Sequence, residues 1–253
     1  MHPTVPIDSR LVVALIAIFV AGIAKGVTGM GIPVVGVPIL AALYGDLRLI
    51  LPMTIVATTL SDVAMAWRWR RPLGEARILV PFAVAGLVGI VAGTQLLVRV
   101  RPQFLSALLA CVVIAFVVVS LLGKMPTLER GAAGRWGAAI GLAAGAIQGS
   151  AGASGPIVTS YLLSMQLPRA TFLFAINVIF AVLDVTQTAS LGRLGLLHVA
   201  SLGAVAVVTA LALVGMWIGF AVHDRIDDRA FQRGVLVLLA VTAVGLLARA
   251  ARA

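Results

Sequence analysis

Long apolar stretches alternate along the chain with short polar ones that carry most of its arginines. A membrane-spanning helix needs about 20 predominantly apolar residues. Two stretches, 32–44 and 156–166, are too short to cross a bilayer comfortably. We therefore predict an all-α polytopic membrane protein with about eight transmembrane helices plus two short broken or re-entrant helices. The predicted spans are 11–29, 49–66, 77–98, 104–122, 134–151, 171–191, 198–221 and 231–249.

One sequence pattern occurs twice, as GIAKGVTGMGIP at 22–33 and as GAIQGSAGASGP at 145–156. Three of its glycines, Gly22, Gly26 and Gly29, and its closing proline recur at a constant offset of 123 (145 − 22 = 123). A second pair of similar segments, VGIVAG at 88–93 and VGMWIG at 214–219, is repeated at an offset of 126 (214 − 88 = 126). These echoes predict one transmembrane domain built from two duplicated units, each with four spans and one short helix. The predicted units are 1–125 and 126–253.

The composition agrees with a membrane protein, since 61% of the 253 residues are hydrophobic and 11% are charged. Soluble domains have about 45–50% apolar and about 25% charged residues. The net charge of +10 would suggest a nucleic-acid partner in a soluble protein. Here the arginines lie between apolar stretches, as in WRWRR at 67–71, where they act as topology signals and contact lipid headgroups. We therefore expect membrane lipid and no nucleic acid among the partners.

The glycines and prolines of the repeated pattern would break a membrane helix. Irregular backbone is tolerated at membrane depth only where it lines a cavity or is buried in protein. A helix that starts after such a break presents free N–H groups and partial positive charge, so two breaks brought together would bind an anion. The predicted substrate-binding residues are those at the breaks: Lys25, Thr28, Gly29, Gly31, Gln148, Ser150, Gly152 and Ser154.

Lys25 lies deep in the first apolar stretch, where a charge is costly and usually has a purpose or a partner. Its equivalent in the second copy, Gln148, is a neutral donor. Two alternatives stay open at this point. Lys25 could instead snorkel to the interface, and the small residues at the breaks could serve close helix packing.

Four more polar residues lie inside apolar stretches. Asp184 could carry a coupling H⁺ or Na⁺, or pair with Lys25, whereas Asp62 is expected to pair with nearby arginines. Thr54 and Asn177 share the repeat offset (177 − 54 = 123) and could cap helices or line the cavity.

The duplicated break, GxxKGxxGxGxP at 22–33 with its degenerate copy at 145–156, resembles the sulfite exporter TauE/SafE family, also called the 4-toluenesulfonate uptake permease family. The resemblance covers essentially the whole chain. It implies a multi-pass secondary transporter of the bacterial inner membrane, without enzymatic activity or cofactor. The implied substrate is a small sulfur-containing anion such as sulfite, sulfoacetate or a related organosulfonate. From the duplicated breaks themselves we expect alternating access, in which the two repeat halves rock to expose the anion to either side.

Export is the expected direction, because an inside-negative potential favours expelling each negative charge by about 2.3 kcal/mol per 100 mV. Import would need H⁺ or Na⁺. The protein is expected to be a monomer or a homodimer, with no bound metal. Two alternative functions remain: an anion channel, and an intramembrane serine protease that uses Ser154 as nucleophile and His198 as base.

Overall fold

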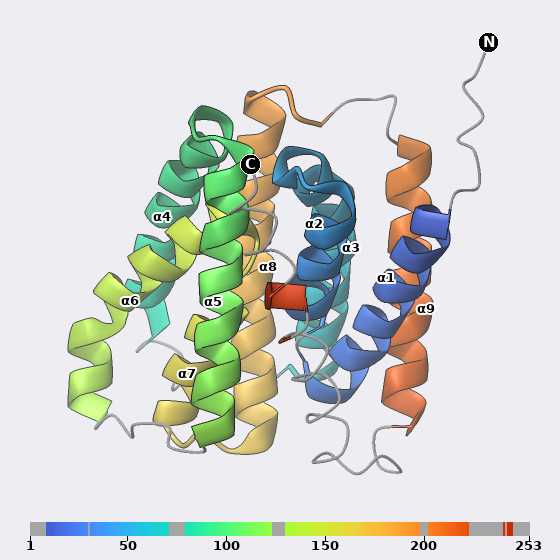
Figure 1. Ribbon diagram of the computed structural model, residues 1–253. Coiled ribbons are helices and arrows are strands. Elements are labelled where there is room, and N and C mark those ends of the chain that lie inside the picture. The colour runs from blue at the N-terminus through green and yellow to red at the C-terminus, as the bar shows by residue number, and fades with distance from the viewer. Residues whose placement is uncertain are drawn as a thin grey trace.

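A computed structural model describes residues 9–29, 31–70, 79–122, 130–197, 202–222, 240 and 242–244 of the chain. Throughout these residues the regular structure is helical, and the helices pack into one bundle (Figure 1). The elements are α1 (Ser9–Thr28), the π-helical turn η1 (Ile32–Gly36), α2 (Val37–Tyr44), α3 (Leu47–Arg68), α4 (Val80–Arg99), α5 (Pro102–Leu122), α6 (Arg130–Ala151), α7 (Gly155–Ser164), α8 (Arg169–Arg193) and α9 (Leu202–Val222).

Within the described part of the chain, six helices are long and apolar enough to cross a membrane. They are α1, α3, α4, α5, α8 and α9, and each coincides with a predicted span. The prediction of an all-α polytopic membrane protein is therefore confirmed. The predicted span 134–151 corresponds to the 22-residue helix α6, while 231–249 lies almost wholly outside the described residues. The total of eight spans stays a prediction.

The two apolar stretches that are too short to span form short helices beside the breaks. The first runs through η1 into α2, and the second is α7. A proline occupies the first turn of η1 and of α7, where its missing N–H costs no helical hydrogen bond. Each short helix packs in its own apolar cluster, η1 and α2 in one and α7 in the other.

Two helix pairs cross at distances that only glycine permits. Figure 1 shows α1 against α9 at one side of the bundle and α4 against α6 at the other. A Cβ atom on Gly26 would overlap the carbonyl oxygen of Met216, and one on Gly93 would overlap that of Ala146. Small residues at such interfaces let membrane helices approach closely. Further glycines with the same constraint are Gly22, Gly215 and Gly219 in the first pair and Gly89, Gly145 and Gly149 in the second.

The matched glycines of the sequence echoes occupy matched places in the two crossings. Gly22 of α1 and Gly145 of α6 both meet backbone of the partner helix, as do Gly89 of α4 and Gly215 of α9. A helix of each predicted unit thus crosses a helix of the other. The division into two repeats remains a prediction, and these reciprocal crossings support it.

Substituting Gly93 by leucine is expected to destabilise the bundle strongly, because the side chain would have to displace the backbone of α6 at Ala146. Overpacking of this kind costs about 1–3 kcal/mol, occasionally more. Gly203→Leu is the matched control, since Gly203 has open space around its Cβ position on α9. Thermal unfolding in detergent measures the difference. Equal melting temperatures for the two variants would contradict the close crossing.

Candidate functional site

Each break is a sharp turn at a glycine where a long helix ends. Gly29 after α1 has φ 79° and Gly152 after α6 has φ 68°, in the left-handed region that favours glycine. The N–H of Gly29 donates to the carbonyl of Lys25 at 2.8 Å, and that of Gly152 donates to the carbonyl of Gln148 at 2.8 Å. The two equivalent positions of the repeated pattern therefore end their helices in the same way.

Lys25 of α1 forms an ion pair with the Oδ1 atom of Asp62 on α3. The side chains are 1% and 0% exposed, so the pair is withdrawn from the surface altogether. The Lys25 ammonium also lies 5.6 Å from the centre of the Phe180 ring on α8, within the range of a cation–π contact. Lys25 is therefore a buried, paired cation beside the first break and does not snorkel to the interface.

The expectation that Asp62 pairs with nearby arginines is wrong. Arg68 and Arg70 follow Asp62 in sequence, but both are exposed at the end of α3. Their guanidinium groups stack on the rings of Phe220 and Trp67, at 5.1 and 4.7 Å. Asp62 instead points into the bundle, where Lys25 is the cation within reach.

Gln148, the equivalent of Lys25, connects the second break to α8. Its Nε2 donates to Asp184 Oδ1 at 3.0 Å and to Gln187 Oε1 at 3.3 Å. Its Oε1 accepts hydrogen bonds from the backbone N–H and the hydroxyl of Ser154, at 3.1 and 2.8 Å. Gln187 in turn donates to the Gln148 carbonyl at 3.0 Å. All four side chains are at most 2% exposed.

The two polar pairs belong to one buried cluster, which we call the break cluster: Lys25, Asp62, Gln148, Ser154, Asp184 and Gln187. Lys25 pairs with an acid 37 residues later, and Gln148 with an acid 36 residues later. Asp62 and Asp184 interact electrostatically with each other, and both interact electrostatically with Lys25. The sequence left open that Asp184 pairs with Lys25. In the structure, Lys25 pairs with Asp62 instead. Asp184 interacts electrostatically with both residues.

The remaining predicted hydroxyls bond to their own helices. Thr28 donates to the carbonyl of Ala24 at 2.8 Å and Ser150 to that of Ala146 at 2.7 Å. Thr54 donates to the carbonyl of Ile50 at 3.0 Å. Such bonds to the residue four positions earlier satisfy a hydroxyl inside a membrane helix without a ligand.

Asn177 differs from the residues with these hydroxyls because one of its two polar side-chain atoms, Oδ1, has no hydrogen-bond partner. It is 0% exposed, and its Nδ2 donates to the carbonyl of Leu173 at 2.6 Å. Its Oδ1 is buried without a hydrogen bond. A Cβ atom on Gly29 would lie 3.8 Å from the Asn177 amide nitrogen, so Asn177 stands beside the first break.

Sequence reasoning missed Gln187 as a member of the break cluster. Gln187 lies three positions after Asp184, a spacing that places two side chains on one face of a helix. That spacing, between two polar residues of an apolar stretch, was the available signal. The sequence marks Asp62 as an embedded acid. It lies 37 residues after Lys25, so no local pattern indicates that the two side chains form a pair.

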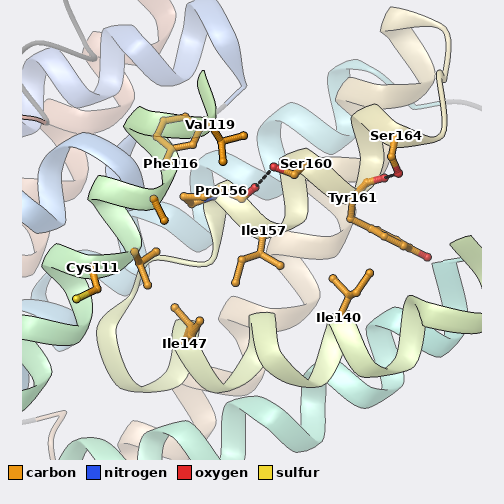
Figure 2. Close-up of a pocket in the computed structure, with 12 residues that line it drawn as sticks. Cys111, Phe116, Val119, Ile140, Ile147, Pro156, Ile157, Ser160, Tyr161 and Ser164 are labelled. Atoms are coloured by element: carbon orange, nitrogen blue, oxygen red, sulfur yellow. Dashed lines mark hydrogen bonds between the residues drawn. The ribbon is translucent and has the colours of Figure 1, made fainter. Parts of the chain in front are cut away.

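A pocket of about 540 Å³ opens between α5, α6 and α7 (Figure 2). Its lining is apolar, as Figure 2 shows for Phe116, Ile147 and Ile157. The serine hydroxyls at its wall donate to the carbonyls of Pro156 and Tyr161, at 2.7 and 2.6 Å. The lining contains no residue of the break cluster and no charged group, so it is not suited to an anion.

A helical membrane bundle with paired helix breaks and a buried charged cluster beside them is a build typical of membrane transporters. The chain matches the family described as sulfite exporter TauE/SafE over residues 14–246. It therefore belongs to the TauE/SafE family, a family of membrane transporters and not of enzymes. No curated protein and no solved structure was found to match the chain.

The family match confirms the resemblance. It also argues against the alternative function of an intramembrane serine protease, because the family consists of transporters. The hydroxyl of Ser154, the proposed nucleophile, donates to Gln148, which is not a base. The proposed base, His198, lies outside the described residues. The GASG pattern at 152–155 is accounted for as the turn and the start of α7.

Proposed function

We propose that this protein exports a small sulfur-containing anion, such as sulfite, sulfoacetate or a related organosulfonate, across the bacterial inner membrane. The observation that carries the proposal is Lys25, a cation that is 1% exposed and stands beside a helix break. A buried charge inside a membrane protein marks a substrate or ion pathway. Family membership supports the class of substrate.

The proposed anion site lies between the two breaks, near Gly29–Gly31 and Gly152–Ser154. Lys25 would supply the positive charge, and Gln148 and the break backbone would supply neutral donors. In the described arrangement these donors are occupied, since Lys25 contacts Asp62 and the Ser154 N–H donates to Gln148. The anion must therefore compete with Asp62 and Gln148 for them. Such competition makes binding depend on a rearrangement of the breaks, as alternating access requires.

The membrane potential drives export without a coupling ion, because it favours outward movement of each negative charge by about 2.3 kcal/mol per 100 mV. Import of the same anion would need H⁺ or Na⁺, with Asp184 as the candidate carrier. Both directions use one site. All residues of the break cluster come from one chain, so the proposed site is the same in a monomer and in a homodimer.

Counterflow in proteoliposomes tests the proposal. Vesicles preloaded with unlabelled sulfite are expected to accumulate labelled sulfite transiently, with saturation. A carrier gives this behaviour because unlabelled sulfite inside the vesicle competes with the labelled sulfite that has entered for the outward trip through one saturable site. An anion channel gives unsaturated flux and no accumulation. Sulfate and chloride serve as competing anions. Flux of all anions alike without saturation would favour the channel and overturn the carrier.

A further inference from the structure

The break cluster contains one more acid than its cation can balance. Among the described residues of the cluster, Lys25 carries one positive charge and Asp62 and Asp184 carry one negative charge each when ionised. The three side chains are at most 1% exposed. An uncompensated charge is expensive inside protein and more so inside a membrane. A further positive charge must therefore be held at this place.

The two acids also lack hydrogen-bond donors at matching atoms. Asp62 Oδ1 contacts Lys25 and Asp184 Oδ1 accepts from Gln148, but the Oδ2 atoms of both acids are buried without a partner. Thr58 stands near Asp184, yet its hydroxyl donates to the carbonyl of Ile55 at 2.8 Å. Buried polar atoms are nearly always hydrogen-bonded. The two Oδ2 atoms without a partner therefore indicate that a hydrogen-bond donor, such as a proton on one of the two acids, is present between them.

We propose that Asp62 and Asp184 share one exchangeable proton between their Oδ2 atoms. One proton supplies the missing charge and both missing contacts, because a protonated carboxyl donates to a neighbouring carboxylate. Two carboxyl groups in one buried site hold such a proton since they cannot both ionise at low cost. The shared proton leaves Asp62 Oδ1 paired with Lys25. The proposal goes beyond the transport of an anion, which needs no proton for export.

In the described part of the chain, no other charged residue of the surrounding helices stands in the middle of a helix. Lys25 of α1 is the charged residue that faces the two acids. The other charged residues of α1, α3, α4, α6 and α8 are arginines near helix ends, and α9 has none. The arginines are Arg10, Arg48, Arg68, Arg99, Arg130, Arg135, Arg169 and Arg193.

Infrared spectroscopy of the reconstituted full-length protein without added anion tests the shared proton. The wild type is expected to show the C=O stretch of a protonated carboxyl at neutral pH. Asp62→Asn and Asp184→Asn should each abolish this band, because the remaining acid then ionises beside Lys25. Asp46→Asn is the matched control. Asp46 caps α3 by accepting from the Arg48 N–H at 2.9 Å, far from the cluster, and should leave the band intact.

A wild-type spectrum without the band overturns the proposal, whether or not the variants fold. A sodium ion held by two ionised acids would give that result. A band that survives in both asparagine variants belongs to other acids and overturns it as well. The measurement needs no substrate, so it is independent of the proposed function. A band together with absent sulfite counterflow would refute the transport proposal alone, and counterflow without a band would refute the proton site alone.

Discussion

Asp62→Ala is expected to lower the free energy of unfolding by about 3 kcal/mol. Removing one partner of a buried ion pair costs about 3–5 kcal/mol, because the other charge is left without its contact. The lower end applies here since Asp184 still interacts electrostatically with Lys25 and keeps the total charge balanced. Unfolding of the purified protein in mixed detergent micelles measures the change.

The double variant Lys25→Met/Asp62→Leu separates the loss of the pair from the loss of either side chain. Replacing a buried ion pair by apolar residues of similar volume is often neutral or stabilising. We therefore expect the double variant to regain most of the stability that Asp62→Ala loses, but not to transport. A double variant as unstable as Asp62→Ala would contradict the view that the loss arises because the Lys25 ammonium is left buried without its contact.

Lys25→Met is expected to weaken the binding of sulfite roughly 10- to 150-fold and to reduce counterflow at subsaturating sulfite accordingly. The estimate follows from about 1.5–3 kcal/mol for a hydrogen bond to a charged group and about 1.4 kcal/mol for each factor of ten. Methionine keeps an unbranched apolar chain of similar reach, so the packing of α1 changes little.

Arg68→Met is the matched control for the loss of one positive charge. Arg68 is exposed at the end of α3 and stacks on Phe220, away from the break cluster. Counterflow should therefore be retained in Arg68→Met. Equal effects of the two substitutions would mean that the anion responds to the overall positive charge of the protein and not to the buried site.

The helices and breaks were predictable because they depend on local features of the sequence. The lengths of apolar stretches identified the six observed candidate spans, and the glycine and proline of each break located Gly29 and Gly152 as turns. The short stretch 32–44 is wholly helical, although it begins as a π turn before α2. Nothing in the pattern of apolar residues distinguishes these two helix types.

The pairing of Asp62 was not predictable in the same way because it depends on how α1 and α3 face each other. Proximity in sequence favoured the arginines at 68–71. The fold instead turns Asp62 inward and leaves Arg68 and Arg70 at the surface. The repeat offset offered a partial signal, since Lys25 and Gln148 are equivalent and each pairs with an acid 36–37 residues later. Asp62 and Asp184, however, are 122 residues apart (184 − 62 = 122) and not 123. The repeat therefore does not align the two acids, and only the structure shows that the two pairs correspond.

Titration of the purified protein with sulfite, sulfate, sulfoacetate, taurine and chloride tests most directly whether the breaks form an anion site. The thermal stability of wild type and of Lys25→Ala is followed as each anion is added, because a ligand that binds only the folded state stabilises it. Selective, saturable stabilisation by one sulfur-containing anion, weakened in Lys25→Ala, is the predicted result. No stabilisation by any anion, with both proteins responding alike, would contradict the assignment of Lys25 and the breaks to substrate binding.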